Sequence, residues 1–248
     1  SSFTTSLLHF LSNKLKLLVK TTIFIILVCI VAYSVFPSQL TEKEWILYGK
    51  SYGVTLGLTL GGGIIGITLG VLLAYLRFQK VRAVEIIIDE YIDIMRGTPM
   101  VLQLLIFSVV IFATWSNNFY VAVIALGLNS AAYVAEIVRS GIESIDKGQM
   151  EASRAIGMPY SMSMNEIILP QAIKNILPAL VNEFITLFKE TSIVGYISVM
   201  DITMNSKSLQ ATYYNPKPIL FTGIIYYVSV KIFSFLSKKL EGKLKSND

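Results

Sequence analysis

The chain has 248 residues, of which 54% are hydrophobic and only 15% are charged, and its net charge is +5. This composition excludes an ordinary soluble domain. The charges are also segregated, since none occurs in residues 51–76 or 97–135. Because a helix needs about 20 apolar residues to cross a bilayer, the sequence predicts an all-α protein that crosses the membrane several times. An excess of positive charge is typical of cytoplasmic membrane flanks, so we expect the lipid bilayer, and no nucleic acid, as the partner of the basic residues.

Residues 1–50 form the first predicted unit. Residues 3–20 mix leucines with lysines at helical spacings, which predicts an amphipathic lead-in on the cytoplasmic face. Residues 21–36 predict the first transmembrane helix, and residues 40–50 a short external loop. A basic start before a short apolar stretch also occurs in secretory signals, but no A-x-A-like cleavage site follows here, so we expect the helix to be retained.

Residues 51–240 are expected to hold five more transmembrane helices, and residues 241–248 a basic tail. Glycines recur every four residues in the first of the five, which favours close packing against another helix. The next has a polar start at residues 77–96 and is interrupted at Gly97, Thr98 and Pro99. With both termini cytoplasmic, 16 of the 21 Lys and Arg residues lie on the cytoplasmic side, as the positive-inside rule requires. The expected spans are residues 52–76, 77–115, 119–138, 175–200 and 219–236.

The residue inventory excludes several kinds of site. The single cysteine, Cys29, allows no disulfide within the chain and is expected to pack in the apolar core. The lone His9 belongs to no catalytic or metal-binding set. The sequence has no G-x-x-x-x-G-K-[ST] phosphate loop, so we expect no ATP site in this chain. The prediction is a protein that is not itself an enzyme, with no catalytic residue, metal or cofactor of its own.

A polar island at residues 146–170 separates two long apolar regions. Asp146 is placed to cap a helix that Gly157 ends. Ser163 and Glu166 predict a second capping box, just before Pro170. Two short helices that meet at Gly157 make either an ordered cytoplasmic loop or a docking site for a partner protein. Taken alone, these residues leave both interpretations open.

The island also carries a recognisable spacing. Glu151, Ala152 and Ser153, then Gly157, and then Ile167, Leu169 and Pro170 follow the pattern EAA-x3-G-x9-I-x-L-P. This resembles the coupling motif of ABC-importer permeases, with Ser153 in place of its second alanine. Other stretches resemble the polar amino acid permeases within that group more narrowly: Arg96–Pro99 with Gln103, residues 129–136, Lys147–Gln149 and residues 189–192.

The resemblance implies the pore subunit of an ATP-driven amino acid importer in the bacterial cell membrane, with one extra helix before a five-helix type I core. It implies as partners a second permease subunit, two ATPase subunits that hold ATP and Mg²⁺, and an extracytoplasmic amino acid-binding protein. Closure of the ATPase subunits would pull the island and favour an outward-open pore. The residues expected to couple to the ATPase are Gln149, Glu151, Ala152, Ser153, Gly157, Met158, Leu169 and Pro170.

Polar side chains within apolar spans are the candidates for substrate contacts, because they are costly in lipid and usually face a cavity or one another. A carboxylate suits the ammonium group of an amino acid, and a hydroxyl or lysine suits its carboxylate. Glu136 and Arg139 could instead simply pair on one helix, and Arg96 is expected to anchor the cytoplasmic mouth. The substrate candidates are Asn129, Tyr133, Glu136, Glu183, Lys189, Glu190, Thr191 and Ser192.

Two other functions stay open on the sequence. An ABC permease for a metal, phosphonate or methionine would share the coupling motif but lack the patterns at residues 96–99 and 129–136. A secondary transporter or channel would need no cytoplasmic dock, and many such folds contain internal repeats. We find no convincing repeat in this chain.

Overall fold

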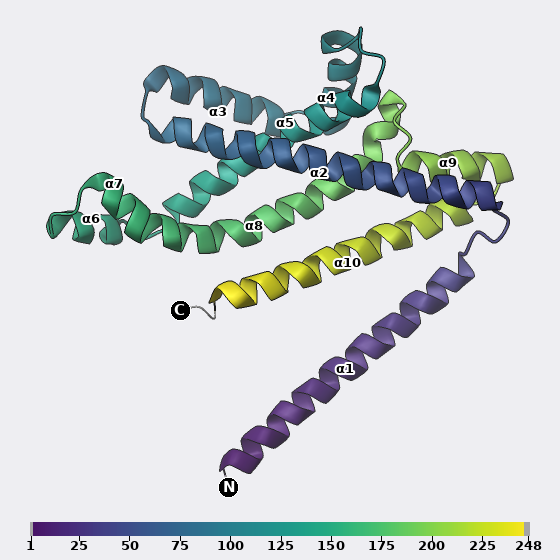
Figure 1. Ribbon diagram of the computed structural model, residues 1–248, viewed down its shortest axis with the longest axis horizontal. Coiled ribbons are helices and arrows are strands. Elements are labelled where there is room, and N and C mark those ends of the chain that lie inside the picture. Colours follow the sequence, from purple (N-terminus) through teal and green to yellow (C-terminus); the bar gives the residue numbers. More distant parts are fainter. Residues whose placement is uncertain (1, 246–248) are drawn as a thin grey trace.

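The computed structural model describes the backbone of residues 2–245 and the side chains of residues 12–239, 241 and 242. Every regular element in this part of the chain is helical, which confirms the predicted all-α class. The body of the molecule consists of three long helices that run side by side (Figure 1). They are α2 (Glu42–Phe78), α5 (Asn118–Glu143) and α8 (Leu169–Glu190).

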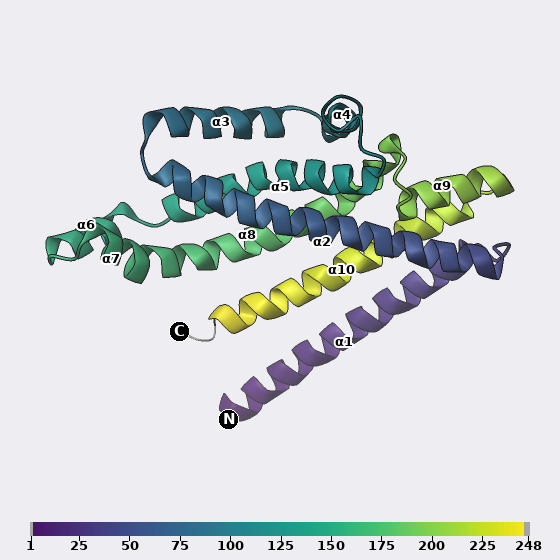
Figure 2. The same cartoon turned by 45° about the horizontal axis from the view of Figure 1, so that its top comes forward.

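Figure 2 separates the layers around this body. Helix α3 (Arg82–Gly97) covers α5 on one side and buries Ile88, Ile92 and Met95 against it. Helix α10 (Lys217–Lys245) packs beside α8 on the other side, where the rings of Phe188 and Tyr226 lie 5.0 Å apart. Helix α1 (Ser2–Ser34) lies beyond α10, at the edge of the molecule (Figure 2).

Glycines allow α2 and α5 to pack closely. A Cβ atom added at Gly70 would lie 2.6 Å from the side chain of Val134, and one at Gly66 would lie 2.8 Å from Ser130. Non-bonded atoms do not approach so closely, so side chains at these positions would push the helices apart. The close packing predicted from the glycine spacing is therefore confirmed.

The third predicted span is sharply bent. Helix α4 (Met100–Ile106) and the π-helical turn η1 (Phe107–Ile111) follow α3, and the two helical parts are bent by 109°. Thr98, between them, is extended, as expected for a residue that precedes proline. The predicted interruption at Gly97–Pro99 is confirmed, and the structure adds that the chain turns there by more than a right angle.

Four described helices are long and apolar enough to cross a membrane, or five spans if the bent pair counts as one. Helix α8 is not among them, because polar residues such as Lys174, Asn182 and Glu183 lower its apolar character. The multi-pass helical class is confirmed. The count of six spans and the cytoplasmic placement of both termini stay predictions.

Several predicted boundaries were wrong. Helix α1 is continuous over Ser2–Ser34, so the lead-in and the first span are not separate elements. Residues 42–50 are the first turns of α2 rather than an external loop, because Thr41 and Glu44 form a capping box there. Cys29 is exposed on α1 and not part of the core.

The structure also differs from the prediction in the fifth predicted span and in the stretch that follows it. Helix α8 begins at Leu169 and ends at Glu190, and a 3-10 helix, η3 (Thr191–Ile197), follows it. The stretch between the fifth and sixth expected spans contains a further helix, α9 (Ile202–Tyr213). The buried Asp201 side chain caps α9 through hydrogen bonds from the backbone N–H groups of Thr203 and Met204.

Candidate coupling segment and transport path

The island at residues 146–170 forms a short arm at one end of the molecule, at the far left of Figure 1. The arm consists of α6 (Lys147–Ala155), α7 (Tyr160–Ser163) and the π-helical turn η2 (Met164–Ile168). The Asp146 carboxylate accepts a hydrogen bond from the backbone N–H of Gly148 at 2.7 Å. The predicted helix cap at Asp146 is confirmed.

Gly157 turns the chain between α6 and α7. Its φ angle is +90°, a conformation that residues with a side chain rarely adopt. A Cβ atom at Gly157 would meet no other atom within 4 Å. The guanidinium group of Arg154 donates to the carbonyl of Met158 at 2.6 Å and closes the turn. Glycine is therefore required here by the backbone, while the space around it is open.

The second half of the arm corrects the prediction. Ser163 is the last residue of α7 and has helical backbone angles, so it does not cap a new helix with Glu166. Pro170 does not mark an exit, because it lies in the first turn of α8, where proline is tolerated. Residues 160–190 instead form one uninterrupted helical stretch, so the arm is joined directly to α8.

Ser153 lies inside the arm. It is 2% exposed, and its hydroxyl donates to the carbonyl of Met150 at 2.8 Å. A serine in place of the alanine of the motif is thus accommodated without leaving a polar group unpaired. The other residues expected to couple to an ATPase are exposed or half-buried: Gln149, Glu151, Ala152, Gly157, Met158, Leu169 and Pro170.

Three large apolar side chains on the arm were missed by sequence reasoning. Ile156 is 80% exposed, Tyr160 is 54% exposed and Met162 is 51% exposed. Their signal was visible in the sequence, because they are apolar residues on both sides of Gly157 in an otherwise polar stretch. Large apolar side chains that stay exposed together on one short arm are typical of a surface that contacts a partner.

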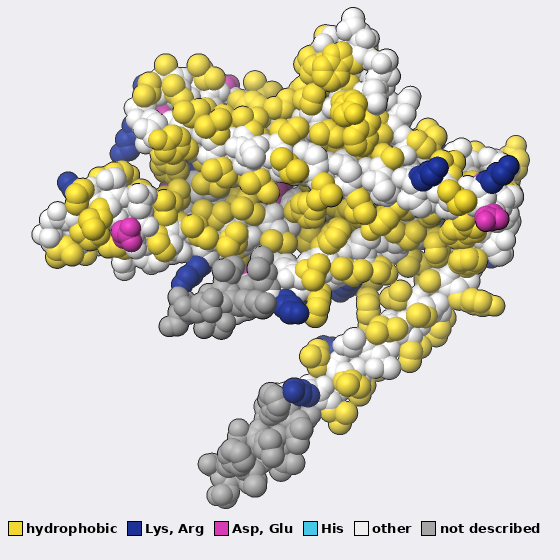
Figure 3. Space-filling model, in the orientation of Figure 1, with side chains coloured by type: hydrophobic (Ala, Val, Ile, Leu, Met, Phe, Trp, Pro, Cys, Tyr) yellow, Lys and Arg dark blue, Asp and Glu magenta, His cyan; other side chains and the backbone are white. Residues whose placement is uncertain are grey.

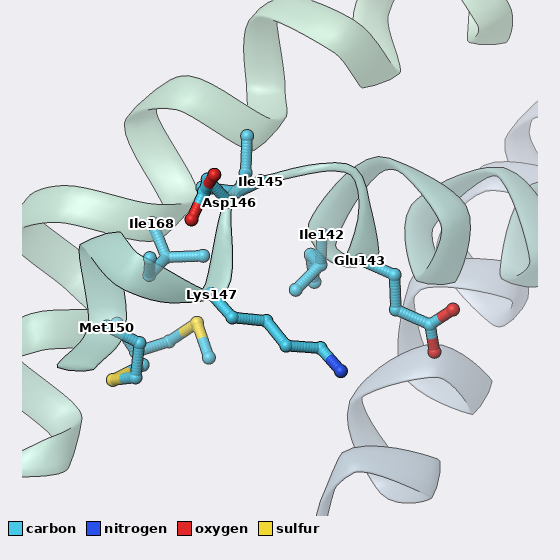
Figure 4. A pocket seen from close by; sticks show the side chains of 8 residues that line it. Ile142, Glu143, Ile145, Asp146, Lys147, Met150 and Ile168 are labelled. Atoms are coloured by element: carbon cyan, nitrogen blue, oxygen red, sulfur yellow. The ribbon is translucent and has the colours of Figure 1, made fainter.

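A pocket of about 450 Å³ lies between the arm and the end of α5. Ile142 and Glu143 line it from α5, and Lys147 and Met150 line it from α6 (Figure 4). The Lys147 side chain extends across the pocket, whereas Glu143 points away from it (Figure 4). The Glu143 carboxylate pairs with the guanidinium group of Arg139 at 2.5 Å. The arm is therefore not packed tightly against α5.

The bend between α3 and α4 is held by two amides. In a continuous helix the carbonyl of Met95 would accept from residue 99, but Pro99 has no N–H to donate. The Nε2 of Gln103 donates to this carbonyl at 2.8 Å, and the Nδ2 of Asn129 donates to it at 3.0 Å. Asn129 Nδ2 also donates to Gln103 Oε1 at 2.9 Å. Asn129 thus satisfies a backbone group that proline leaves without a partner.

Charged side chains near the end of α5 pair within the chain. Glu136 accepts from the guanidinium group of Arg139 at 2.9 Å, so the pairing that was one of the two interpretations does form. The guanidinium carbon of Arg96 lies 5.3 Å from the centroid of the Tyr133 ring. This cation–π contact ties α3 to α5. Arg96 therefore anchors α3 to α5 through Tyr133, and its place at the cytoplasmic mouth stays a prediction.

Residues 66–246 match the family described as binding-protein-dependent transport system inner membrane component. The chain belongs to this family. The match includes the arm and every helix from the last third of α2 onward. It leaves α1 and residues 42–65, about two thirds of α2, outside, and it confirms the resemblance to ABC-importer permeases.

Relatives with a named function carry the comparison further. The permease is 50% identical over 166 residues to the arginine transport system permease protein ArtQ of Bacillus subtilis (strain 168). The aligned region covers 65% of this chain and 76% of that protein. It is 39% identical over 183 residues to the putative glutamine transport system permease protein GlnP of Rickettsia conorii (strain ATCC VR-613 / Malish 7). This aligned region covers 71% of this chain and 83% of that protein.

Solved structures agree on the fold. The crystal structure of an amino acid ABC transporter with histidines matches with a TM-score of 0.77 at 39% identity, over 81% of this chain and 95% of that chain. An inward-facing structure of the MetNI methionine ABC transporter matches with a TM-score of 0.68 at 21% identity, over 83% of this chain and 99% of that chain. The second likeness shows the fold alone.

The permease does not bring its candidate substrate residues together in one place. Asn129 and Tyr133 face α3 through their contacts with Met95 and Arg96. Glu183 lies on α8, where it is 8% exposed and accepts from the hydroxyl of Ser130 on α5 at 2.8 Å. These residues support two different helix contacts of α5.

The remaining candidates lie where α8 changes into η3. Thr191 is fully buried and its hydroxyl donates to the carbonyl of Phe188 at 2.7 Å. Glu190 and Ser192 are half-buried, and Lys189 is exposed. Within the described residues, no group of three or more His, Cys, Asp or Glu side chains is placed to hold a metal ion.

Proposed function

We propose that this permease is the pore subunit of an ATP-driven amino acid importer in the bacterial cell membrane. The exposed arm with the coupling motif supports ATP-driven transport, because it offers a surface on which an ATPase subunit can act. The chain itself has no phosphate loop. The observation that carries the substrate class is the 50% identity to a permease named for arginine transport. Its partners would be a second permease subunit, two ATPase subunits holding ATP and Mg²⁺, and an extracytoplasmic binding protein.

The continuity of the arm with α8 supports a mechanism for this coupling. An ATPase that moves α6 and Gly157 would displace α7, and the uninterrupted helical stretch of residues 160–190 would carry the displacement along α8. Glu183 on α8 holds Ser130 on α5, so this motion would act on the contact between the two helices. ATP would then shift the permease between two states that differ in that contact.

The substrate residues are proposed with different roles. Asn129 and Thr191 have their hydrogen-bonding groups engaged within the chain, so we assign them to the walls of the path. Lys189, Glu190 and Ser192 keep accessible polar groups, which suit the carboxylate and ammonium groups of an amino acid. Glu136, bound to Arg139, is proposed as a polar group at the cytoplasmic mouth, and Tyr133 as the support of Arg96.

The test is uptake by vesicles that contain the permease with its partners. Labelled arginine, glutamine and methionine would be offered with and without the ATPase subunits. We expect uptake of a polar amino acid that requires ATP, the ATPase and the binding protein. Uptake that persists without any ATPase subunit would show a secondary transporter or channel. ATP-driven uptake of methionine alone would show a permease for another class of solute.

A further inference from the structure

Helix α1 stands apart from the rest of the permease. It lies near α10 at its C-terminal end, and the two helices diverge toward the N-terminus of α1 and the C-terminus of α10 (Figures 1 and 2). Phe36, just after α1, stacks on Trp45 with a centroid distance of 5.2 Å and meets Phe221 edge-on at 5.6 Å. Beyond this anchor, no described residue of α1 is buried. Something other than this chain must therefore fill the space along α1.

An apolar groove of about 420 Å³ lies between the two helices, and we call it the α1–α10 groove. Leu27 and Val31 line it from α1, and Leu220 and Ile224 line it from α10. Gly223 also faces the groove, and a Cβ atom there would meet nothing within 4 Å. The groove is thus open, and its lining suits a hydrocarbon chain.

One end of the α1–α10 groove carries a positive charge. The Lys231 ammonium lies 5.5 Å from the ring centroid of Phe24 and 5.4 Å from that of Tyr227. Lys231 lies within the apolar stretch of α10 that is long enough to cross a membrane. No ion pair among the described side chains involves Lys231. A charge within an apolar span is costly without a counter-charge, so an anion from outside the chain would stabilise it.

The facing helix supplies more lysines at the same end. Lys16, Lys20 and Phe24 follow one another at spacings of four, so they share one face of α1, and Phe24 contacts Lys231 on α10. Figure 3 shows dark blue Lys side chains on both helices toward these ends. The described part of α1 has no acidic residue, and Glu241, on α10, accepts from the Ser237 hydroxyl. The charge around this end of the groove is therefore positive.

We propose that the α1–α10 groove binds an anionic phospholipid. Its phosphate lies between Lys20 and Lys231, and one acyl chain lies along the apolar wall of the groove. Each lysine near a membrane surface favours an anionic lipid by roughly fivefold, so two lysines together produce a preference of about 25-fold over a zwitterionic lipid. The lipid fills the space that the chain leaves beside α1. This inference does not depend on which solute the permease carries.

The experiment uses the full complex in nanodiscs of phosphatidylcholine with phosphatidylglycerol as the anionic probe. A photo-crosslinking amino acid replaces Leu27 in the groove, and mass spectrometry identifies the adducts. We expect phosphatidylglycerol adducts enriched about 25-fold over the share of this lipid in the disc. The double variant Lys20→Gln with Lys231→Gln should remove the enrichment. The control double variant Lys43→Gln with Lys50→Gln, in the first turns of α2 and away from the lysine end of the groove, should keep it.

Two further variants separate lipid binding from a lysine that merely reaches the membrane surface. Gly223→Leu fills the groove without changing the charge, and we expect it to reduce all lipid adducts at position 27 severalfold. Lys231→Arg keeps the charge and should keep the enrichment. That result would show that the loss in Lys231→Gln comes from the missing charge and not from misfolding. Equal labelling by both lipids in the unsubstituted complex, enrichment that survives loss of both lysines, or adducts to a protein chain would each overturn the proposal.

Discussion

Glycine serves opposite purposes in the α2–α5 contact and in the coupling arm. Gly70 is buried in the middle of a helix, where a Cβ atom would lie 2.6 Å from Val134. Gly157 is exposed at a turn, where a Cβ atom would meet nothing within 4 Å but the φ angle is +90°. The first glycine allows two helices to pack, and the second keeps a turn open. The difference predicts that substitutions at Gly70 damage the fold, while those at Gly157 damage coupling.

The largest effect is expected from Gly70→Leu. The added side chain meets Val134 in a contact between helices, and overpacking of this kind costs about 3 kcal/mol. We expect a lower melting temperature and a loss of monodisperse protein in detergent. Gly53→Leu is the matched control, because Gly53 lies on the same helix with nothing within 4 Å of its Cβ position. A normal melting temperature for Gly70→Leu would show that α2 and α5 are not packed as described.

Gly157→Asp should leave the permease folded but reduce the rate of ATP-driven uptake at least tenfold. The strain of a side chain at this φ angle costs about 1–2 kcal/mol, which a large helical body withstands, whereas the charge lies where the proposed ATPase surface would meet the arm. Gly157→Asn is the control, since asparagine tolerates positive φ and adds no charge. Melting temperature and vesicle uptake are measured together. Full ATP-driven uptake by Gly157→Asp would contradict docking at this turn.

A smaller effect is expected at the bend between α3 and α4. Asn129→Ala removes one of the two donors to the Met95 carbonyl, and a buried polar group with fewer partners costs about 2 kcal/mol. Pro99→Ala restores a backbone N–H at the position that would serve this carbonyl in a helix. We therefore expect Asn129→Ala to lower the melting temperature less when Pro99→Ala is present. Equal losses in both backgrounds would show that Asn129 acts on something else.

The smallest effect on stability is expected from Glu136→Gln. Arg139 keeps its second partner, Glu143, and a partly exposed ion pair contributes less than about 1 kcal/mol. If Glu136 meets the substrate, the variant should weaken uptake of arginine more than uptake of glutamine, because only arginine has a cationic side chain. Uptake of both would be measured at matched protein levels. Equal losses for the two amino acids would argue against direct recognition.

The arm shows how far sequence reasoning reaches. Asp146 and Gly157 act through their own backbone neighbours, so their roles as cap and turn could be predicted from local spacing. Ser163 matched a capping box with Glu166 equally well, yet the chain stays helical through Ser163 and into α8. Whether a helix stops or continues there depends on packing between the arm and α8, and no local spacing contains that information.

The sequence by itself determined the helical membrane class, the interruption at Gly97–Pro99 and the coupling motif, because each follows from composition, local backbone chemistry or fixed spacing. Only the tertiary structure decided which contacts the polar membrane residues make. Asn129, a substrate candidate by sequence, donates to the carbonyl of Met95, which is 34 positions away in the sequence. Partners this distant are brought together by helix packing alone. The same packing identifies Val134 on α5 as the residue against which Gly70 lies, which the glycine spacing alone does not specify.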